Sequence, residues 1–357
     1  MTVQRQLRFW LIGFIVFFAL LWLLSGILLP FVAGMAVAYL LDPPCDRLEA
    51  MGLSRTLATT ILTVAFLLII VGALLLLLPL LIGQLAGFVE RLPAYLEALR
   101  RHSVELLATL EARVDPALVD KLKESLAGSA EQLFTWSTAL VGRLISGGVA
   151  VANLISLVVI TPVVAFYLLR DWDRLVEKID GWLPQEHAEA IRQQLGEIDQ
   201  TLAGFVRGQS MVCLILAVFY ATALSFAGLD FGLLIGLIAG LLTFIPFVGS
   251  AVGLVASVGM ALVQFDDWLR IAIVAAIFLV GQAVEGNYLT PKLVGDRVGL
   301  HPVWVIFALL AGGFLFGFVG VLLAVPIAAV IGVLIRFFFD IYLASPLYKG
   351  SGGANSP

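Results

Sequence analysis

The segment at positions 282–295 carries residue types that could bind a polar solute or move a proton inside a membrane. It reads QAVEGNYLTPKLVG, and Glu285 follows fourteen uncharged residues. An ionisable group at such a place is costly unless it is paired or hydrated, so Glu285 is a candidate functional residue. Burial would favour its protonated form, which suits a proton carrier. The alternative is an interfacial carboxylate that pairs with Lys292 or Arg207.

Amide side chains extend this candidate site. Gln282 and Asn287 flank the carboxylate, and Gln209 follows Arg207 at the start of another apolar run. Amides in membrane helices bind polar solutes or join helix to helix, and both interpretations stay open here. Arg207 would anchor at the lipid headgroups. Gln209 would then lie deeper, as a candidate for the wall of a cavity.

A second candidate is a break inside an apolar run, at positions 244–250 with the sequence FIPFVGS. Pro246 removes a backbone donor, and Gly249 permits non-helical dihedral angles. Transporters use such breaks to offer backbone groups to a substrate, and Ser250 would add a hydroxyl. A purely structural kink is the equal alternative, because non-helical backbone is also tolerated where protein buries it.

The sequence around the break is weakly repeated later in the chain. Gly228-Leu229 and the triplet FVG at 247–249 recur 71 positions later, at 299–300 and 318–320. With Gly317 and Gly320 as its breakers, the second copy would form another broken helix pair. Two such pairs that enter from opposite sides would make an inverted repeat, the architecture of alternating access. Chance similarity in so apolar a sequence is the competing explanation.

The elements that must position these residues are membrane helices. Hydrophobic residues make up 61% of the 357 positions and charged residues 13%, and the mean hydropathy is +1.06. A soluble chain has about twice that share of charge. Three apolar runs exceed the roughly 20 residues of one crossing and contain breakers, Pro30 in the first of them. We therefore predict an all-α membrane protein with about eight transmembrane helices, two broken or re-entrant pairs, and the repeat in its C-terminal half.

Basic residues set the predicted topology. With the N-terminus inside, the short outer loops hold only Arg270, which places both termini in the cytoplasm. We expect the protein in the inner or cytoplasmic membrane. The predicted regions are N-terminal transmembrane helices (1–82), an extramembrane amphipathic helical segment (83–148), a transmembrane helix plus a cytoplasmic amphipathic helix (149–204), a transport core (205–340) and a disordered tail (341–357).

The extramembrane segment mixes charges of both signs with apolar residues at helical spacing. Pro93 would stand near a helix start within it. We favour a structural cap or an oligomer contact over a ligand-binding domain for this segment.

Several classes of function are excluded. The sequence has no nucleotide-binding loop and no hydrolase or zinc-protease motif, so we expect no enzyme, no nucleotide and no cofactor beyond an ion gradient. Cys45 and Cys213 are isolated, which excludes a disulfide framework and a zinc site of the usual spacing. A net charge of −4 without a basic stretch argues against nucleic acid.

At its motifs the chain resembles the autoinducer-2 exporter family, a family of predicted permeases. The resemblance runs from Phe9 to about Phe339. Its motifs stand here as Phe205-Val206-Arg207-Gly208-Gln209, Ile245-Pro246-Phe247-Val248-Gly249, Glu285-Gly286-Asn287-Tyr288-Leu289-Thr290-Pro291-Lys292, Gly299-Leu300-His301-Pro302, and the late glycines with Pro326. Ser250 stands where the family often has proline.

The resemblance implies about eight membrane segments, cytoplasmic termini, homo-oligomers in the lipid bilayer and transport of small polar molecules. Family members are assigned to autoinducer-2 export, with its role in quorum sensing, and others to exchange of sodium or lithium for protons. We therefore predict a secondary transporter that exports a small polar solute. The alternatives are a monovalent cation/proton antiporter, a channel-like oligomer and a non-transporting scaffold.

Overall fold

The computed structural model describes residues 3–111, 148–295 and 299–349, and this part of the chain contains helices and no strands. The all-α prediction is therefore confirmed for the described residues. Most of the predicted extramembrane segment and the last eight residues lie outside them. The helices are α1 (Val3–Leu23), α2 (Leu29–Ala50), α3 (Arg55–Glu111), α5 (Gly148–Asp180), α6 (Ala188–Phe226), α7 (Gly232–Leu242), α8 (Val248–Gln264), α9 (Trp268–Val284), α10 (Pro302–Ala344) and α11 (Pro346–Lys349), with a 3-10 turn (Ser25–Ile27) and a π-helix (Glu285–Val294).

Five described helices are long and apolar enough to cross a membrane: Arg55–Tyr95, Leu154–Asp180, Ala188–Phe226, Trp268–Val294 and Pro302–Ala344. In α3 the most apolar window has a mean hydropathy of 3.2, and only 6% of it is buried by protein. Side chains such as Leu68 and Leu75 are about 70% exposed there. Such a surface needs lipid around it, so the chain is a polytopic membrane protein. The count of eight crossings stays a prediction.

The chain divides into two compact units. The first unit comprises residues 1–67, 156–209 and 291–357, and the second comprises residues 68–155 and 210–290. The region boundaries predicted after positions 82 and 204 fall inside α3 and α6, which continue through them. Pro93 was expected near a helix start, and this expectation is wrong, because α3 runs through Pro79 and Pro93 without a break. Pro30 marks a break as predicted, since it lies in the first turn of α2.

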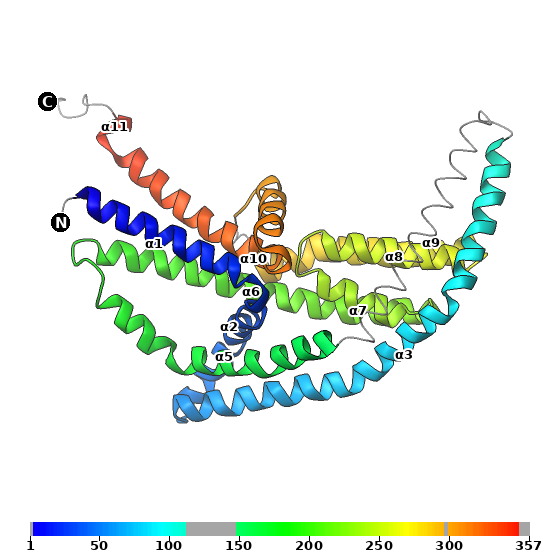
Figure 1. Cartoon of the computed structure of the whole chain (residues 1–357), viewed down its shortest axis with the longest axis horizontal. Coiled ribbons are helices and arrows are strands. Elements are labelled where there is room, and N and C mark those ends of the chain that lie inside the picture. The colour runs from blue at the N-terminus through cyan, green and yellow to red at the C-terminus, as the bar shows by residue number, and fades with distance from the viewer. Residues whose placement is uncertain (1–2, 112–147, 296–298, 350–357) are drawn as a thin grey trace. The chain divides into compact units, whose positions relative to one another are not determined.

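In the second unit, small residues bring helix backbones close together. A Cβ atom on Gly240 would overlap the backbone of Ala217, and one on Gly236 would overlap that of Ala221. These two glycines lie one turn apart on α7, and the alanines lie one turn apart on α6. The backbone approach gives dense packing without large side chains, as is common between membrane helices. Helices α7 and α8 then run side by side as a hairpin (Figure 1).

The predicted break at Pro246 is present. Helix α7 ends at Leu242, α8 begins at Val248, and Phe247 between them has a φ of 68°. The expectation that Gly249 itself breaks the helix is wrong, because Gly249 lies within α8. Its missing side chain serves packing instead, since a Cβ atom there would overlap Thr243 and the carbonyl of Ala239.

The last apolar run, which forms α10 in the first unit, is also interrupted and also has a closely packed glycine after the interruption. Helix α10 is kinked at Gly317, whose φ of 59° and ψ of −139° strongly favour glycine. Gly320 was predicted as a breaker, but it lies in the helix after the kink, where a Cβ atom would overlap Gly312. Gly228 and Gly299, which are paired in the sequence repeat, both have positive φ angles. The two copies thus share local features, while their inverted arrangement stays a prediction.

We expect Gly240→Ala to lower the thermal unfolding temperature of the purified protein by several degrees, because the added methyl group must separate α6 from α7. Gly259→Ala is the matched control, since Gly259 lies in α8 with open space around it. Alanine there should leave stability unchanged or raise it slightly. Equal melting temperatures for the two variants would contradict the packing described here.

Candidate functional site

Arg55 is the centre of a polar cluster in the first unit. Its side chain is 17% exposed and makes ion pairs with Asp42 at 3.0 Å, with Glu49 at 3.3 Å and with Asp46. Its Nε also donates to the carbonyl of Leu169 at 2.9 Å. One guanidinium therefore joins the start of α3 to α2 and α5. The planar group with five donors suits this multiple pairing, which a lysine could not reproduce.

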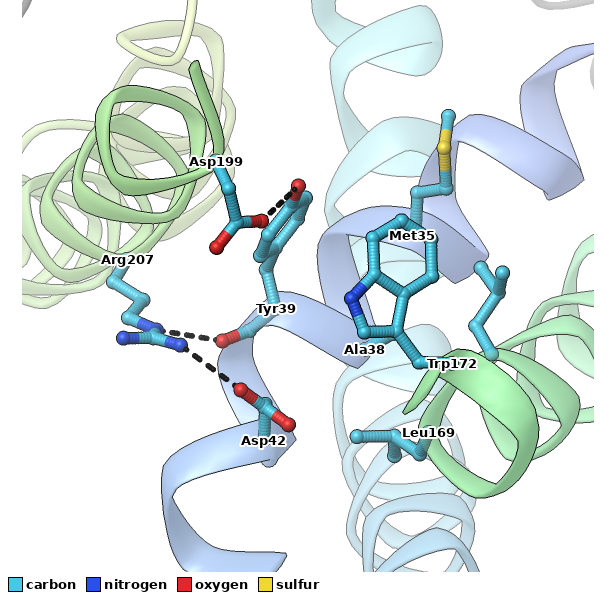
Figure 2. A pocket seen from close by; sticks show the side chains of 9 residues that line it. Met35, Ala38, Tyr39, Asp42, Leu169, Trp172, Asp199 and Arg207 are labelled. Atoms are coloured by element: carbon cyan, nitrogen blue, oxygen red, sulfur yellow. Dashed lines mark hydrogen bonds and ion pairs between the residues drawn. The ribbon is translucent and has the colours of Figure 1, made fainter. Parts of the chain in front are cut away.

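A pocket lies beside this cluster and is shown in Figure 2. Arg207 donates from Nε to the carbonyl of Tyr39 at 2.7 Å, and its second nitrogen lies 3.5 Å from Asp42. The hydroxyl of Tyr39 donates to Asp199 at 3.0 Å. The indole of Trp172 forms a further wall, together with Met35, Ala38, Leu168 and Leu169.

Partial burial disfavours the charged form of Asp42. Burial raises the pKa of its carboxyl and the nearby Asp46 raises it further, while hydrogen bonding and attraction from Arg55 lower it. Arg55 and Arg207 both pair with Asp42, so the carboxylate is held by two cations. Arg207, expected to anchor at lipid headgroups, instead ties α6 to α2.

The two residues after Arg207 have different surroundings. A Cβ atom on Gly208 would overlap the carbonyl of Leu293, so glycine lets α6 lie against the end of the π-helix. Gln209 is 6% exposed and therefore buried by protein, while its place in a cavity wall stays a prediction. Gly208 is thus a packing residue, as the sequence motif suggested.

Glu285 follows the last residue of α9, has helical dihedral angles and is the first residue of the π-helix. Its Oε2 atom is buried and has no hydrogen-bond partner. Within the described part of its own unit, Glu285 makes no ion pair. The alternative of an ion pair with Lys292 or Arg207 stays a prediction, because both cations belong to the first unit and Glu285 belongs to the second. Lys292 is exposed.

Pro291 lies within the π-helix and helps to explain its wider turn. A proline cannot donate to the residue four positions back, so the chain adopts the wider turn through residues 285–294. Asn287 uses its amide locally and donates to the carbonyl of Ala283 at 2.8 Å. Gln282 is exposed. Such π-segments are frequent at functional sites.

Other predicted residues have structural roles. Ser250 donates to the carbonyl of Phe247 at 3.3 Å, within its own turn. His301 accepts from the backbone N–H of Val303 at the start of α10, and Pro302 occupies the first turn. Pro326 is buried within α10. These contacts cap or shape helices.

Of the nine residues predicted to bind solute, six belong to the second unit and three to the first. Within the second unit, Gln282, Glu285 and Asn287 share one stretch, whereas Pro246, Gly249 and Ser250 share the break. Gln209, Gly317 and Gly320 belong to the first unit. Their grouping into one site stays a prediction.

Sequence reasoning missed the polar cluster and one buried tyrosine. The missed residues are Tyr39, Asp42, Arg55, Trp172, Asp199 and Tyr220. Asp42 directly follows a long apolar run, and this position could have identified it as a candidate functional residue. Tyr220 lies inside an apolar run, where a tyrosine gives no pattern of its own.

These features define a polytopic α-helical membrane protein with broken helices and a buried carboxyl oxygen that has no hydrogen-bond partner. Broken helices and costly ionisable groups of this kind are typical of membrane transporters. The AI-2E family transporter profile matches residues 11–340, and the chain belongs to this family. The resemblance inferred from the motifs is confirmed.

Three relatives cover nearly the same length. The candidate transport protein YrrI of Bacillus subtilis is 30% identical over 325 residues, covering 89% of this chain and 88% of the relative. The candidate permease PerM of Escherichia coli K12 is 29% identical and covers 90% of each chain. The candidate transport protein YueF of Bacillus subtilis is 26% identical, with 87% of this chain and 82% of the relative covered.

We expect Arg55→Met to destabilise the protein by roughly 2–3 kcal/mol, because three carboxylates and a carbonyl lose their shared donor. The matched control is Arg192→Met. Arg192 pairs with Asp180 at 2.6 Å but is 51% exposed, so its loss should change stability little. Thermal unfolding in detergent measures both. A loss for Arg55→Met no larger than the control's would show that the cluster contributes little.

Proposed function

We propose that the protein is a secondary transporter that moves a small polar solute out of the cell across the bacterial inner membrane, with protons as the coupling ion. The observation that carries this proposal is the buried, unpartnered Oε2 atom of Glu285 in an apolar unit. An ionisable group so placed costs stability and therefore suggests a function. Its place, where α9 becomes a π-helix, adds support.

The broken helices support the same function. Helix α7 has 11 residues and α8 has 17, both short of the roughly 20 needed for a crossing. The first limb of α10 is also short, because Gly317 interrupts it. We propose that both pairs are re-entrant and line the solute path, one with Pro246, Gly249 and Ser250, the other with Gly317 and Gly320. Gln209, Gln282 and Asn287 would offer polar contacts.

Autoinducer-2 is the first solute to test, since family membership supports it. We also propose a homo-oligomer, with the termini in the cytoplasm. Purified protein in proteoliposomes should move autoinducer-2 outward faster under an imposed proton gradient than without one. Exchange of sodium or lithium for protons, with no autoinducer-2 flux, would replace this proposal with the antiporter alternative.

We expect Glu285→Gln to fold normally and to lose the pH dependence of transport, because the amide cannot take up or release a proton. Glu189→Gln is the matched control, since the Glu189 side chain is 91% exposed. Flux in proteoliposomes from pH 5 to pH 9 measures the effect. A pH profile in Glu285→Gln that matches wild type would remove Glu285 from the coupling mechanism.

A further inference from the structure

Two buried polar groups in the second unit lack hydrogen-bond partners: the hydroxyl of Tyr220 and the Oε2 atom of Glu285. The Tyr220 residue is 0% exposed and lies within the last two turns of α6. A buried polar group without a partner destabilises the folded state, because it loses its hydrogen bonds to water. Such groups are rare in folded proteins, so two of them in one unit call for a physical explanation.

The two groups face the same side of α9. A Cβ atom on Gly281 would overlap the Tyr220 hydroxyl, so that hydroxyl lies directly on Gly281. Glu285 follows Gly281 by one helical turn and has helical dihedral angles. Side chains of a helix tilt towards its N-terminus, which directs the Glu285 side chain back towards Gly281. Glu285 is also near enough for its charge to act on Tyr220.

The tyrosine is held firmly in this place. Its ring stacks on Phe278 of α9, with the ring centroids 4.4 Å apart and the planes 16° apart. Phe278 in turn fills the space beside Gly253 of α8. With its ring fixed, Tyr220 can turn only its O–H bond. The absence of a side chain on Gly281 leaves the space that the phenol of Tyr220 fills.

We propose that Tyr220 is the positioning residue of a proton-binding site at Glu285, an inference that rests on the proposed role of Glu285 in coupling. A phenol can donate a hydrogen bond to a carboxylate and can accept one from a carboxylic acid. After a small rotation of the Glu285 side chain, the hydroxyl of Tyr220 can therefore hydrogen-bond to Glu285 in either protonation state. Glu285 takes up and releases the proton, and Tyr220 keeps its own.

A proton fits this site better than a metal cation. The titratable side chains close enough to interact electrostatically with Glu285 are Tyr220 and Cys213, both on α6. Within the described part of this unit, no positively charged group faces Glu285. Hard cations require several oxygen ligands, whereas one carboxyl and one phenol supply few. The described residues contain no group of three or more His, Cys, Asp or Glu side chains that could hold a metal ion.

We expect Tyr220→Phe to raise the pH at which Glu285 is half protonated by about one to two units. The phenol binds the charged carboxylate more strongly than the neutral acid, so its loss disfavours the charged form. Infrared difference spectra of the full-length protein in liposomes follow the carboxyl band across pH. Glu285→Gln identifies the band that belongs to Glu285. The measurement needs no transported solute, so it can succeed or fail independently of the proposed transport.

Tyr288→Phe is the matched control, because Tyr288 lies three residues from Glu285 but is 71% exposed. Its titration should equal that of wild type. Gly281→Ala should shift the band in the same direction as Tyr220→Phe, since the methyl group displaces the hydroxyl. An unshifted band in Tyr220→Phe, or no band lost in Glu285→Gln, overturns the proposal. A wild-type midpoint that moves when sodium is added overturns the assignment to a proton and indicates a cation site.

Discussion

The hydrocarbon interior of a bilayer contains no water for backbone N–H and C=O groups, and the structure follows from this constraint. Continuous helices satisfy these groups internally, which accounts for α3, with its almost unburied apolar window. A break is tolerated where protein surrounds it. At Pro246 and at Gly317 a glycine three residues later packs closely against the preceding limb. The same constraint makes unpartnered side-chain groups costly, and Glu285 and Tyr220 of the second unit each retain one.

Much of the fold could be predicted from the sequence, because lipid imposes a simple rule on composition and length. The apolar runs predicted helices, and Pro30 and Pro246 marked real breaks. Glu285 stood out because a charge after fourteen uncharged residues is rare. In each case a local property of the chain decided the outcome.

The rest depends on contacts between distant segments, which no local pattern encodes. Pro93 does not start a helix, because α3 continues through it. Gly249 and Gly320 are needed for close packing rather than for unusual dihedral angles, and sequence alone does not separate these two uses of glycine. Tyr220 resembles any aromatic residue in an apolar run until the hydroxyl is placed on Gly281. The polar cluster of Asp42, Arg55 and Arg207 joins residues more than a hundred positions apart.

The central claim is that a buried, protonated Glu285 takes part in transport, and its chemical reactivity tests this most directly. A lipid-soluble carbodiimide reacts with protonated carboxyl groups inside a membrane protein, and mass spectrometry of the digested protein locates the modified residue. The account predicts modification at Glu285 that declines as pH rises, together with loss of flux in proportion to the modified fraction. Full modification of Glu285 with unchanged flux would contradict it, as would loss of flux while Glu285 stays unmodified.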